Sequence, residues 1–143
     1  MGKLNWWRTA FAFFLLCLAT VITSSAQTFS TLYNFGGSGD GAGPDGTLIQ
    51  ATDGNLYGTT YQGGNGFGTI FKITPDGELT TIYRFCPQSG CRDGEYPDAP
   101  VVQATDGNFY GTKAIGGSST AGTVQVITPS GTLSSNVPFQ AAP

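Results

Sequence analysis

Large apolar side chains alternate with polar ones in several short stretches of this chain. A period of two places one face of a β-strand against a core and the other in a more polar environment. Three stretches share this alternation and end on phenylalanine: 29–35, 79–85 and 133–139. Shorter runs between turn residues predict further strands, at 48–51, 56–60 and 69–73. No stretch of 27–143 shows a 3.6-residue period, so the pattern predicts an all-β protein.

The chain contains a tandem repeat. The stretch Gln50–Thr59 recurs as Gln103–Thr112 with a single difference. The correspondence extends without gaps from 40–61 to 93–114, and it resumes after a glycine-rich linker that is one residue longer in the second copy. Repetition at this spacing is the mark of an architecture built from similar supersecondary units.

Each unit offers four short strands in about 50 residues, which is the size of one propeller blade. We therefore predict two four-stranded antiparallel propeller-type blades, repeat 1 at 40–85 and repeat 2 at 93–139, with one extra strand at 28–35. Together they would form a partial β-propeller. Pro138 cannot donate to a strand ladder, so the last strand is expected at a sheet edge.

The first 26 residues have the features of an export signal. Basic residues precede an apolar run at 10–22, and Ser24-Ser25-Ala26 supplies the small residues that signal peptidase reads. We predict a signal peptide at 1–26 and a β-repeat domain at 27–143 that is secreted, periplasmic or on the cell surface. The alternative is an uncleaved N-terminal anchor. After cleavage, no membrane span is expected.

The charge of the predicted domain limits its partners. Residues 27–143 carry nine acidic and four basic side chains, which gives a net charge of −5 (four minus nine). Nucleic-acid binding depends on a basic face, so nucleic acid is not expected as a partner, and neither is an anionic membrane.

The repeated motifs resemble those of a known family. They read Asp-Gly-Asn-Leu/Phe-Tyr-Gly-Thr, then Gly-Thr-Ile/Val-x-x-Ile-Thr-Pro, with Asp-Gly-x-x-Pro near the start of each unit. This combination is similar to the GloVer (Gloeobacter/Verrucomicrobia) tandem repeat of exported bacterial proteins. The resemblance implies a secreted repeat protein with a β-propeller fold, and it brings no catalytic residues.

Two blades alone leave apolar faces uncovered. Repeat units bury their faces against neighbours, and arrays usually hold three or more of them. We therefore expect self-association, or further repeats in a longer array of which this chain would be a fragment. A compact two-sheet sandwich is the third possibility. In each of these three cases the expected function is binding or structural, with a carbohydrate or a protein as the possible ligand.

Few residues offer catalytic or metal chemistry. The chain has no histidine, which excludes Ser-His-Asp and Cys-His catalysis and histidine-ligated metals. Cys86 and Cys91 are expected to form a disulfide, because an exported chain meets an oxidising compartment. Six of the seven aspartates directly precede glycine, a pairing typical of tight turns. The alternative is calcium binding in loops at one rim, by Asp40, Asp45, Asp93 and Asp98. No other cofactor is expected.

Residues at which the repeats differ are the better candidates for ligand contacts, since repeated residues more often build the scaffold. By this reasoning the candidate ligand contacts are Arg92, Glu95, Tyr96 and Lys113. An enzyme acting on carbohydrate, or a lyase similar to the streptogramin lyases, is the alternative function. Those lyases are understood to use a histidine, which this chain lacks, so we do not expect an enzyme.

Overall fold

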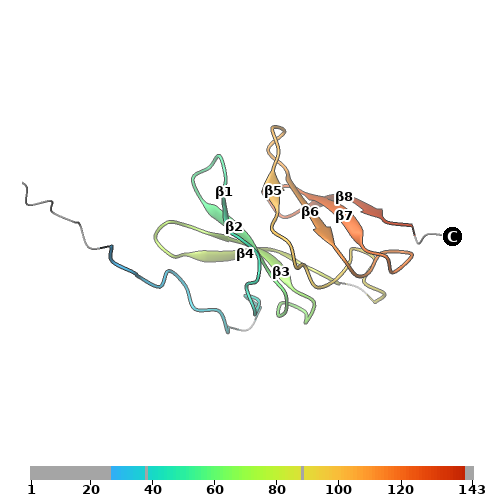
Figure 1. Ribbon diagram of the computed structural model, residues 1–143, viewed down its shortest axis with the longest axis horizontal. Helices are drawn as coiled ribbons and strands as arrows, with labels where there is room; N and C mark the ends of the chain where they lie inside the picture. Colours follow the sequence, from blue (N-terminus) through green and yellow to red (C-terminus); the bar gives the residue numbers. More distant parts are fainter. Residues whose placement is uncertain (1–26, 38, 88, 141–143) are drawn as a thin grey trace, which may run out of the picture. The chain divides into compact units, whose positions relative to one another are not determined.

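The computed structural model describes residues 27–37, 39–87 and 89–140 (Figure 1). The chain divides into two compact units, 1–30 and 31–143, and the description below concerns the second. The predicted signal peptide lies outside the described residues. In the part of the chain that is described, no helix is long and apolar enough to cross a membrane.

Each repeat forms one four-stranded antiparallel sheet. The strands of repeat 1 are β1 (Ile49–Gln50), β2 (Leu56–Thr60), β3 (Thr69–Ile73) and β4 (Leu79–Arg84). Those of repeat 2 are β5 (Val102–Gln103), β6 (Phe109–Lys113), β7 (Thr123–Ile127) and β8 (Leu133–Pro138). Strands pair in sequence order within each sheet, and Pro138 lies in an edge strand as predicted. The all-β prediction is confirmed, and two such sheets, not closed into a ring, are consistent with propeller-type blades.

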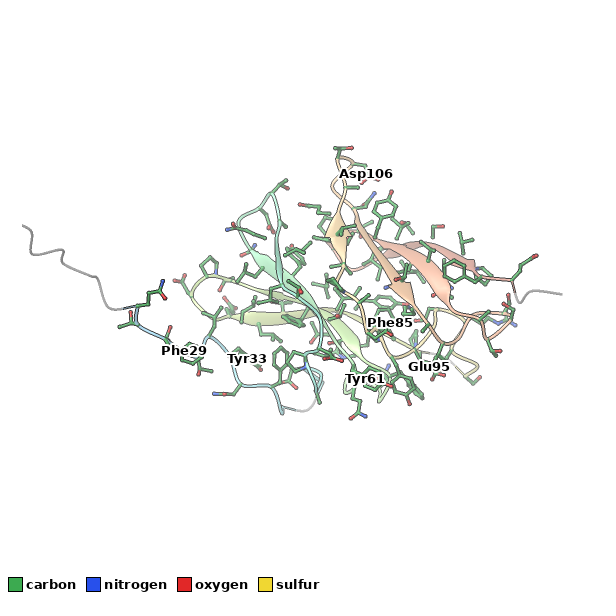
Figure 2. All side chains as sticks on the ribbon, viewed as in Figure 1. Phe29, Tyr33, Tyr61, Phe85, Glu95 and Asp106 are labelled. Carbon is green, nitrogen blue, oxygen red and sulfur yellow. A yellow bond between two sulfur atoms is a disulfide. The ribbon has the colours of Figure 1, made fainter. Side chains whose placement is uncertain are left out.

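The repeated Asp-Gly-Asn motif builds the turn between the first two strands of each sheet. In repeat 1 the Asp53 carboxylate accepts the Asn55 backbone N–H at 3.0 Å, the Asn55 side-chain amide at 2.8 Å and the Tyr57 hydroxyl at 2.9 Å. Asp106 makes the equivalent three bonds at the tip of the β5–β6 hairpin (Figure 2). Gly54 follows at φ 82°, a conformation that glycine adopts without steric cost. Turn formation therefore accounts for the repeated residues.

The same contacts set the protonation state of these groups. The side-chain amide of Asn55 is the main reason that the pKa of Asp53 lies below its ordinary value. Burial, followed by the bond to Asp53, raises the pKa of Tyr57 to about 12. The carboxylate is therefore ionised and the phenol protonated over the whole neutral range, which keeps the turn bonded.

The apolar core lies between the two repeats. The rings of Tyr57 and Phe109 meet at 4.2 Å between centroids, and both side chains are buried. The cluster around them draws members from both sheets: Ala51, Ile70, Phe85, Val101 and Ile127. A four-stranded sheet of this size buries its face only against a neighbour, so repeat 2 acts as the cover of repeat 1.

The predicted extra strand at 28–35 is wrong, since no strand forms there. The segment resembles the fourth strand of each repeat, which pairs with the third strand. Among the described residues both third strands already have that partner, since β3 pairs with β4 and β7 with β8. Its side chains nevertheless pack as those of β4 do. The Tyr33 hydroxyl donates to Asp40 at 2.9 Å, and the Tyr83 hydroxyl donates to Asp93 at 2.8 Å.

The burial of matched phenylalanines predicts unequal effects on stability. Phe85 has no exposed surface, whereas its counterpart in repeat 2, Phe139, is 46% exposed. We expect Phe85→Ala to lower the free energy of unfolding by about 3–5 kcal/mol, the usual cost of emptying a buried phenylalanine site. Phe139→Ala should cost less than about 1 kcal/mol. Urea unfolding at low protein concentration measures both, and equal losses would contradict this account of the core.

Candidate functional site

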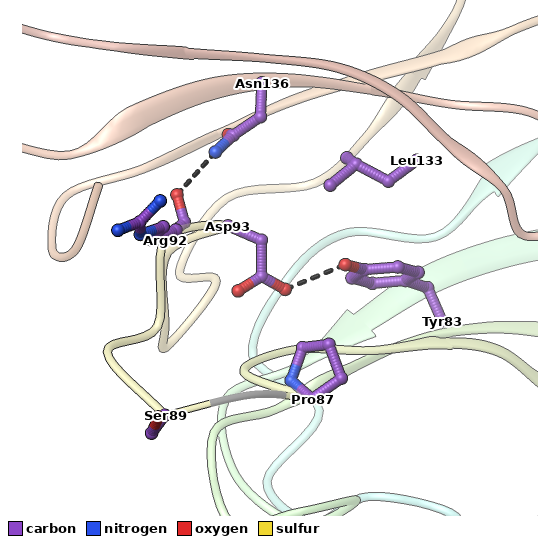
Figure 3. A pocket seen from close by; sticks show the side chains of 7 residues that line it. All are labelled: Tyr83, Pro87, Ser89, Arg92, Asp93, Leu133 and Asn136. Atoms are coloured by element: carbon purple, nitrogen blue, oxygen red, sulfur yellow. Dashed lines mark hydrogen bonds between the residues drawn. The ribbon is translucent and has the colours of Figure 1, made fainter. Parts of the chain in front are cut away.

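A hollow of about 510 Å³ opens where the end of β4, the loop after it and β8 come together (Figure 3). The residues that line it are Tyr83, Pro87, Ser89, Arg92, Asp93, Leu133 and Asn136. A second hollow of about 520 Å³ also includes Arg92 and Asn136 in its lining. Both repeats contribute to the first hollow, which we call the Arg92 cleft.

A disulfide shapes one wall of the Arg92 cleft. Cys86 and Cys91 are bonded, with their Cα atoms 4.4 Å apart, which confirms the predicted pairing. The short loop that the bond closes carries Pro87 and Ser89 into the lining. A covalent link of this kind restricts the conformations open to the loop, so these two residues are held beside Arg92.

Asp93 anchors the floor of the cleft. Its carboxylate accepts the Tyr83 hydroxyl at 2.8 Å and the Cys86 backbone N–H at 3.0 Å, and the residue is 7% exposed. Burial, followed by this hydrogen bond, raises the pKa of Tyr83 well above its ordinary value. Tyr83 therefore stays a hydrogen-bond donor, and the Asp93 carboxylate is already occupied by protein groups.

Arg92 is held by its backbone while its side chain stays free. The Asn136 side-chain amide donates to the Arg92 carbonyl at 2.5 Å (Figure 3). The guanidinium makes no hydrogen bond or ion pair with the described residues, and the residue is exposed. The Asn136 Oδ1 is buried without a partner in the described part of the chain. The cleft therefore combines an unpaired cation with an unsatisfied acceptor.

Lys113 is buried beneath this region. It is 1% exposed, its Nζ donates to the Asp93 carbonyl, and the same atom lies 3.7 Å from the centre of the Phe85 ring. Burial lowers the pKa of Lys113 to about 7, although the nearby Asp93 charge opposes the shift. The amine has no surface from which to reach a ligand in solvent, so its position gives no support to the predicted contact.

Of the other two predicted contacts, Tyr96 lies at the junction between the repeats and Glu95 pairs within repeat 2. Tyr96 stacks on Tyr61 with ring centroids 5.0 Å apart, and its N–H donates to the Phe67 carbonyl at 3.0 Å. Glu95 pairs through its backbone with Ile115. Neither side chain lines the Arg92 cleft. Of the four candidates, the structure places only Arg92 in the cleft.

The aspartates considered for calcium do not gather into a site. Asp40 and Asp93 each accept a tyrosine hydroxyl and backbone N–H groups, donors that a cation would have to replace. Asp45 lines a separate hollow beside Tyr61. Among the described residues, no three side chains of His, Cys, Asp or Glu come together as a metal-binding group.

Comparison with known families agrees with the repeat seen in the structure. The family model of the Gloeobacter/Verrucomicrobia repeat matches residues 19–142. The chain belongs to that repeat family. A comparison with curated proteins finds no match. The resemblance inferred from the motifs is therefore confirmed, and the match covers both repeats.

Sequence reasoning missed Asn136 as a residue of the cleft. In repeat 1 the equivalent position holds Ile82, an apolar residue packed against the core. The rule that selected Arg92, a difference between the repeats, applies equally to Asn136. Asp93 could not be found in that way, because both repeats carry the same aspartate. Tyr83 differs from Val137 at the equivalent position, but the partner of its hydroxyl is visible only in the structure.

The buried lysine predicts how stability depends on pH. Folding lowers the Lys113 pKa from 10.5 to about 7, so between these values the unfolded chain binds more protons than the folded one. The free energy of unfolding should therefore rise from pH 7 to pH 9, by at most about 3 kcal/mol. Lys113→Met should remove this rise, whereas Lys72→Met, on β3, should keep it. Urea unfolding at both pH values measures the difference, and an unchanged rise in Lys113→Met would contradict the assignment.

The disulfide predicts a local effect. Replacing both Cys86 and Cys91 by serine should lower the free energy of unfolding by about 2 kcal/mol, because the closed loop is short. Thermal unfolding followed by circular dichroism measures the loss. A chain that no longer folds would show instead that the bond is required by the whole domain.

Proposed function

We propose that this chain is an exported binding protein of its repeat family, and that the Arg92 cleft binds a carbohydrate that carries a carboxylate. The disulfide supports export, because such bonds persist in oxidising compartments. The family match supports a repeat scaffold. The role proposed is recognition rather than catalysis.

The observation that carries the proposal is where the two repeats differ. Arg92 stands at the position of Gly39, and Asn136 stands at the position of Ile82. These two substitutions meet through the hydrogen bond from Asn136 to the Arg92 carbonyl. Residues common to both repeats build turns and junctions, whereas these unshared residues converge on one hollow.

The chemistry of the lining suits an acidic sugar. A guanidinium presents a planar pair of donors that matches a carboxylate, and the Arg92 guanidinium is unpaired among the described residues. Ser89 adds a hydroxyl for sugar hydroxyls, and Pro87 and Leu133 add apolar surface for a ring face. The volume of about 510 Å³ falls in the range of small-ligand sites.

The arrangement of carboxylates supports binding over hydrolysis. A glycosidase uses two carboxyl groups placed across the scissile bond. Asp93 is the one carboxylate among the described residues of the lining, and Tyr83 and Cys86 already occupy it. Its position suits a structural anchor better than a general acid.

Equilibrium binding tests the proposal. An oligogalacturonate should bind the exported chain at least about ten times more tightly than a neutral oligosaccharide of the same length, since a buried or bidentate charge pair is worth at least about 1.4 kcal/mol. Arg92→Gln should remove that preference, and Lys72→Gln, which removes the same charge on β3, should keep it. Equal affinity for the acidic and neutral sugars, or an unchanged preference in Arg92→Gln, would contradict the proposal.

A further inference from the structure

The junction between the repeats shows which face of a repeat requires a cover. In repeat 1 this face includes Tyr57 and Phe85, which are 2% and 0% exposed because repeat 2 lies against them. A hydrogen bond between backbone and side chain completes the junction, as the Thr52 N–H donates to the Gln103 side-chain oxygen at 2.8 Å. We call this face of a repeat its trailing face.

The trailing face of repeat 2 is open. Val102, Val137 and Phe139 belong to it by their repeat positions, and they are 57%, 59% and 46% exposed. Thr105 corresponds to Thr52, and its N–H has no hydrogen-bond partner in the described part of the chain. Apolar surface and an open donor thus recur together on repeat 2, where none of the described residues covers them.

The opposite side of repeat 1, which we call its leading face, carries the residues that could cover an open trailing face. Val101 fills the junction from repeat 2 and is 1% exposed, whereas its counterpart in repeat 1, Leu48, is 45% exposed. The amide of Gln50 donates to the Gly54 carbonyl at 3.4 Å, as that of Gln103 donates to the Gly107 carbonyl at 3.0 Å. Gln50 is therefore held in the orientation from which Gln103 accepts the Thr52 N–H.

We propose that the trailing face of repeat 2 binds the leading face of repeat 1 in a second copy of this chain, head to tail. In that contact Leu48 of the second copy takes the place that Val101 holds within the chain. Its Gln50 side-chain oxygen accepts the Thr105 N–H. The contact is heterologous, so copies joined in this way close into a ring or extend as a filament.

Residues 31–35 cap the leading face in the single chain. Tyr33 donates to Asp40, and Phe35 packs edge-on against Phe71 with centroids 5.0 Å apart. The Leu32 carbonyl lies against Gly77 just as the Ile82 carbonyl of β4 lies against Gly131. The cap thus occupies the site that β8 of a second copy would fill.

The cap is held more weakly than β8. It pairs with no strand, and most of its residues are exposed, whereas β8 pairs along five positions with β7. Docking of a second copy therefore displaces residues 31–35 and leaves β8 in its sheet. Because docking must first displace the cap, a more firmly held cap raises the concentration at which the chains associate.

Sedimentation equilibrium of the exported chain, without any sugar, tests this docking. We expect the mean molar mass to rise with concentration above that of one chain. Tyr33→Ala with Phe35→Ala loosens the cap and should lower the concentration of half-association at least about ten-fold. Leu48→Asp and Val102→Asp, one on each face, should restore the mass of one chain.

Two further variants complete the test. Ile115→Asp is the control, because Ile115 is as exposed as Leu48 but belongs to neither face, and it should associate as the unaltered chain does. Gln50→Ala should weaken association while leaving urea unfolding unchanged. A single-chain mass at every concentration in the loosened-cap variant would overturn the proposal. So would association that Leu48→Asp and Val102→Asp leave unchanged.

Discussion

Burial at the junction between successive repeats is the interaction on which this structure depends. The buried cluster is shared between the repeats, because it draws Tyr57 from one repeat and Phe109 and Val101 from the next. The rule is directional, since each repeat offers one face to the unit before it and another to the unit after it. Phe85 and Phe139 occupy equivalent positions in the two repeats. Phe85 is buried because repeat 2 covers it, whereas Phe139 is partly exposed. Stability in such a chain belongs to pairs of repeats rather than to single ones.

Aspartates fix the geometry of these pairs. Asp53 and Asp106 close hairpins within a repeat, while Asp40 and Asp93 receive a tyrosine from the segment before their own repeat. Each carboxylate accepts several donors at once, and hydrogen bonds to an ionised acceptor are stronger than those between neutral groups. Low charge and abundant glycine would otherwise make a loose fold. The hydrogen bonds to Asp93 hold the loop beside the Arg92 cleft in a defined position.

Local signals in the sequence were sufficient to predict the strands. Alternating apolar residues and Asp-Gly turns are read within a few residues, and all eight strands follow from them. Residues 28–35 carry the same alternation but form no strand, because pairing requires a neighbour that the local pattern does not reveal. The difference between the repeats selected Arg92 as a candidate ligand contact, and this residue lines the cleft. It also selected Lys113, whose burial depends on the packing of Phe85 from the other repeat. The exposure of such a side chain therefore depends on how the neighbouring repeat packs against it, which the sequence of its own repeat does not reveal.

The two repeats place an arginine differently, which explains why an unpaired guanidinium lines the Arg92 cleft. In repeat 1, Arg84 of β4 reaches across to the Gly39 carbonyl at 3.0 Å, and a Cβ on Gly39 would lie 3.1 Å from that guanidinium. A side chain on the loop would crowd that guanidinium, and Gly39 itself has φ 95°, a conformation that side chains rarely adopt. In repeat 2 the position of Arg84 is taken by Pro138, and Asn136 bonds the loop carbonyl instead. The loop position is then free to carry Arg92. Repeat 1 therefore has an arginine on the strand, Arg84, which bonds the loop. Repeat 2 has an arginine on the loop, Arg92, whose side chain has no partner among the described residues. A scaffold whose turns and junctions are satisfied by aspartate and tyrosine can accept this exchange without losing its repeat geometry, so the loop of repeat 2 carries an exposed arginine where the loop of repeat 1 carries a glycine.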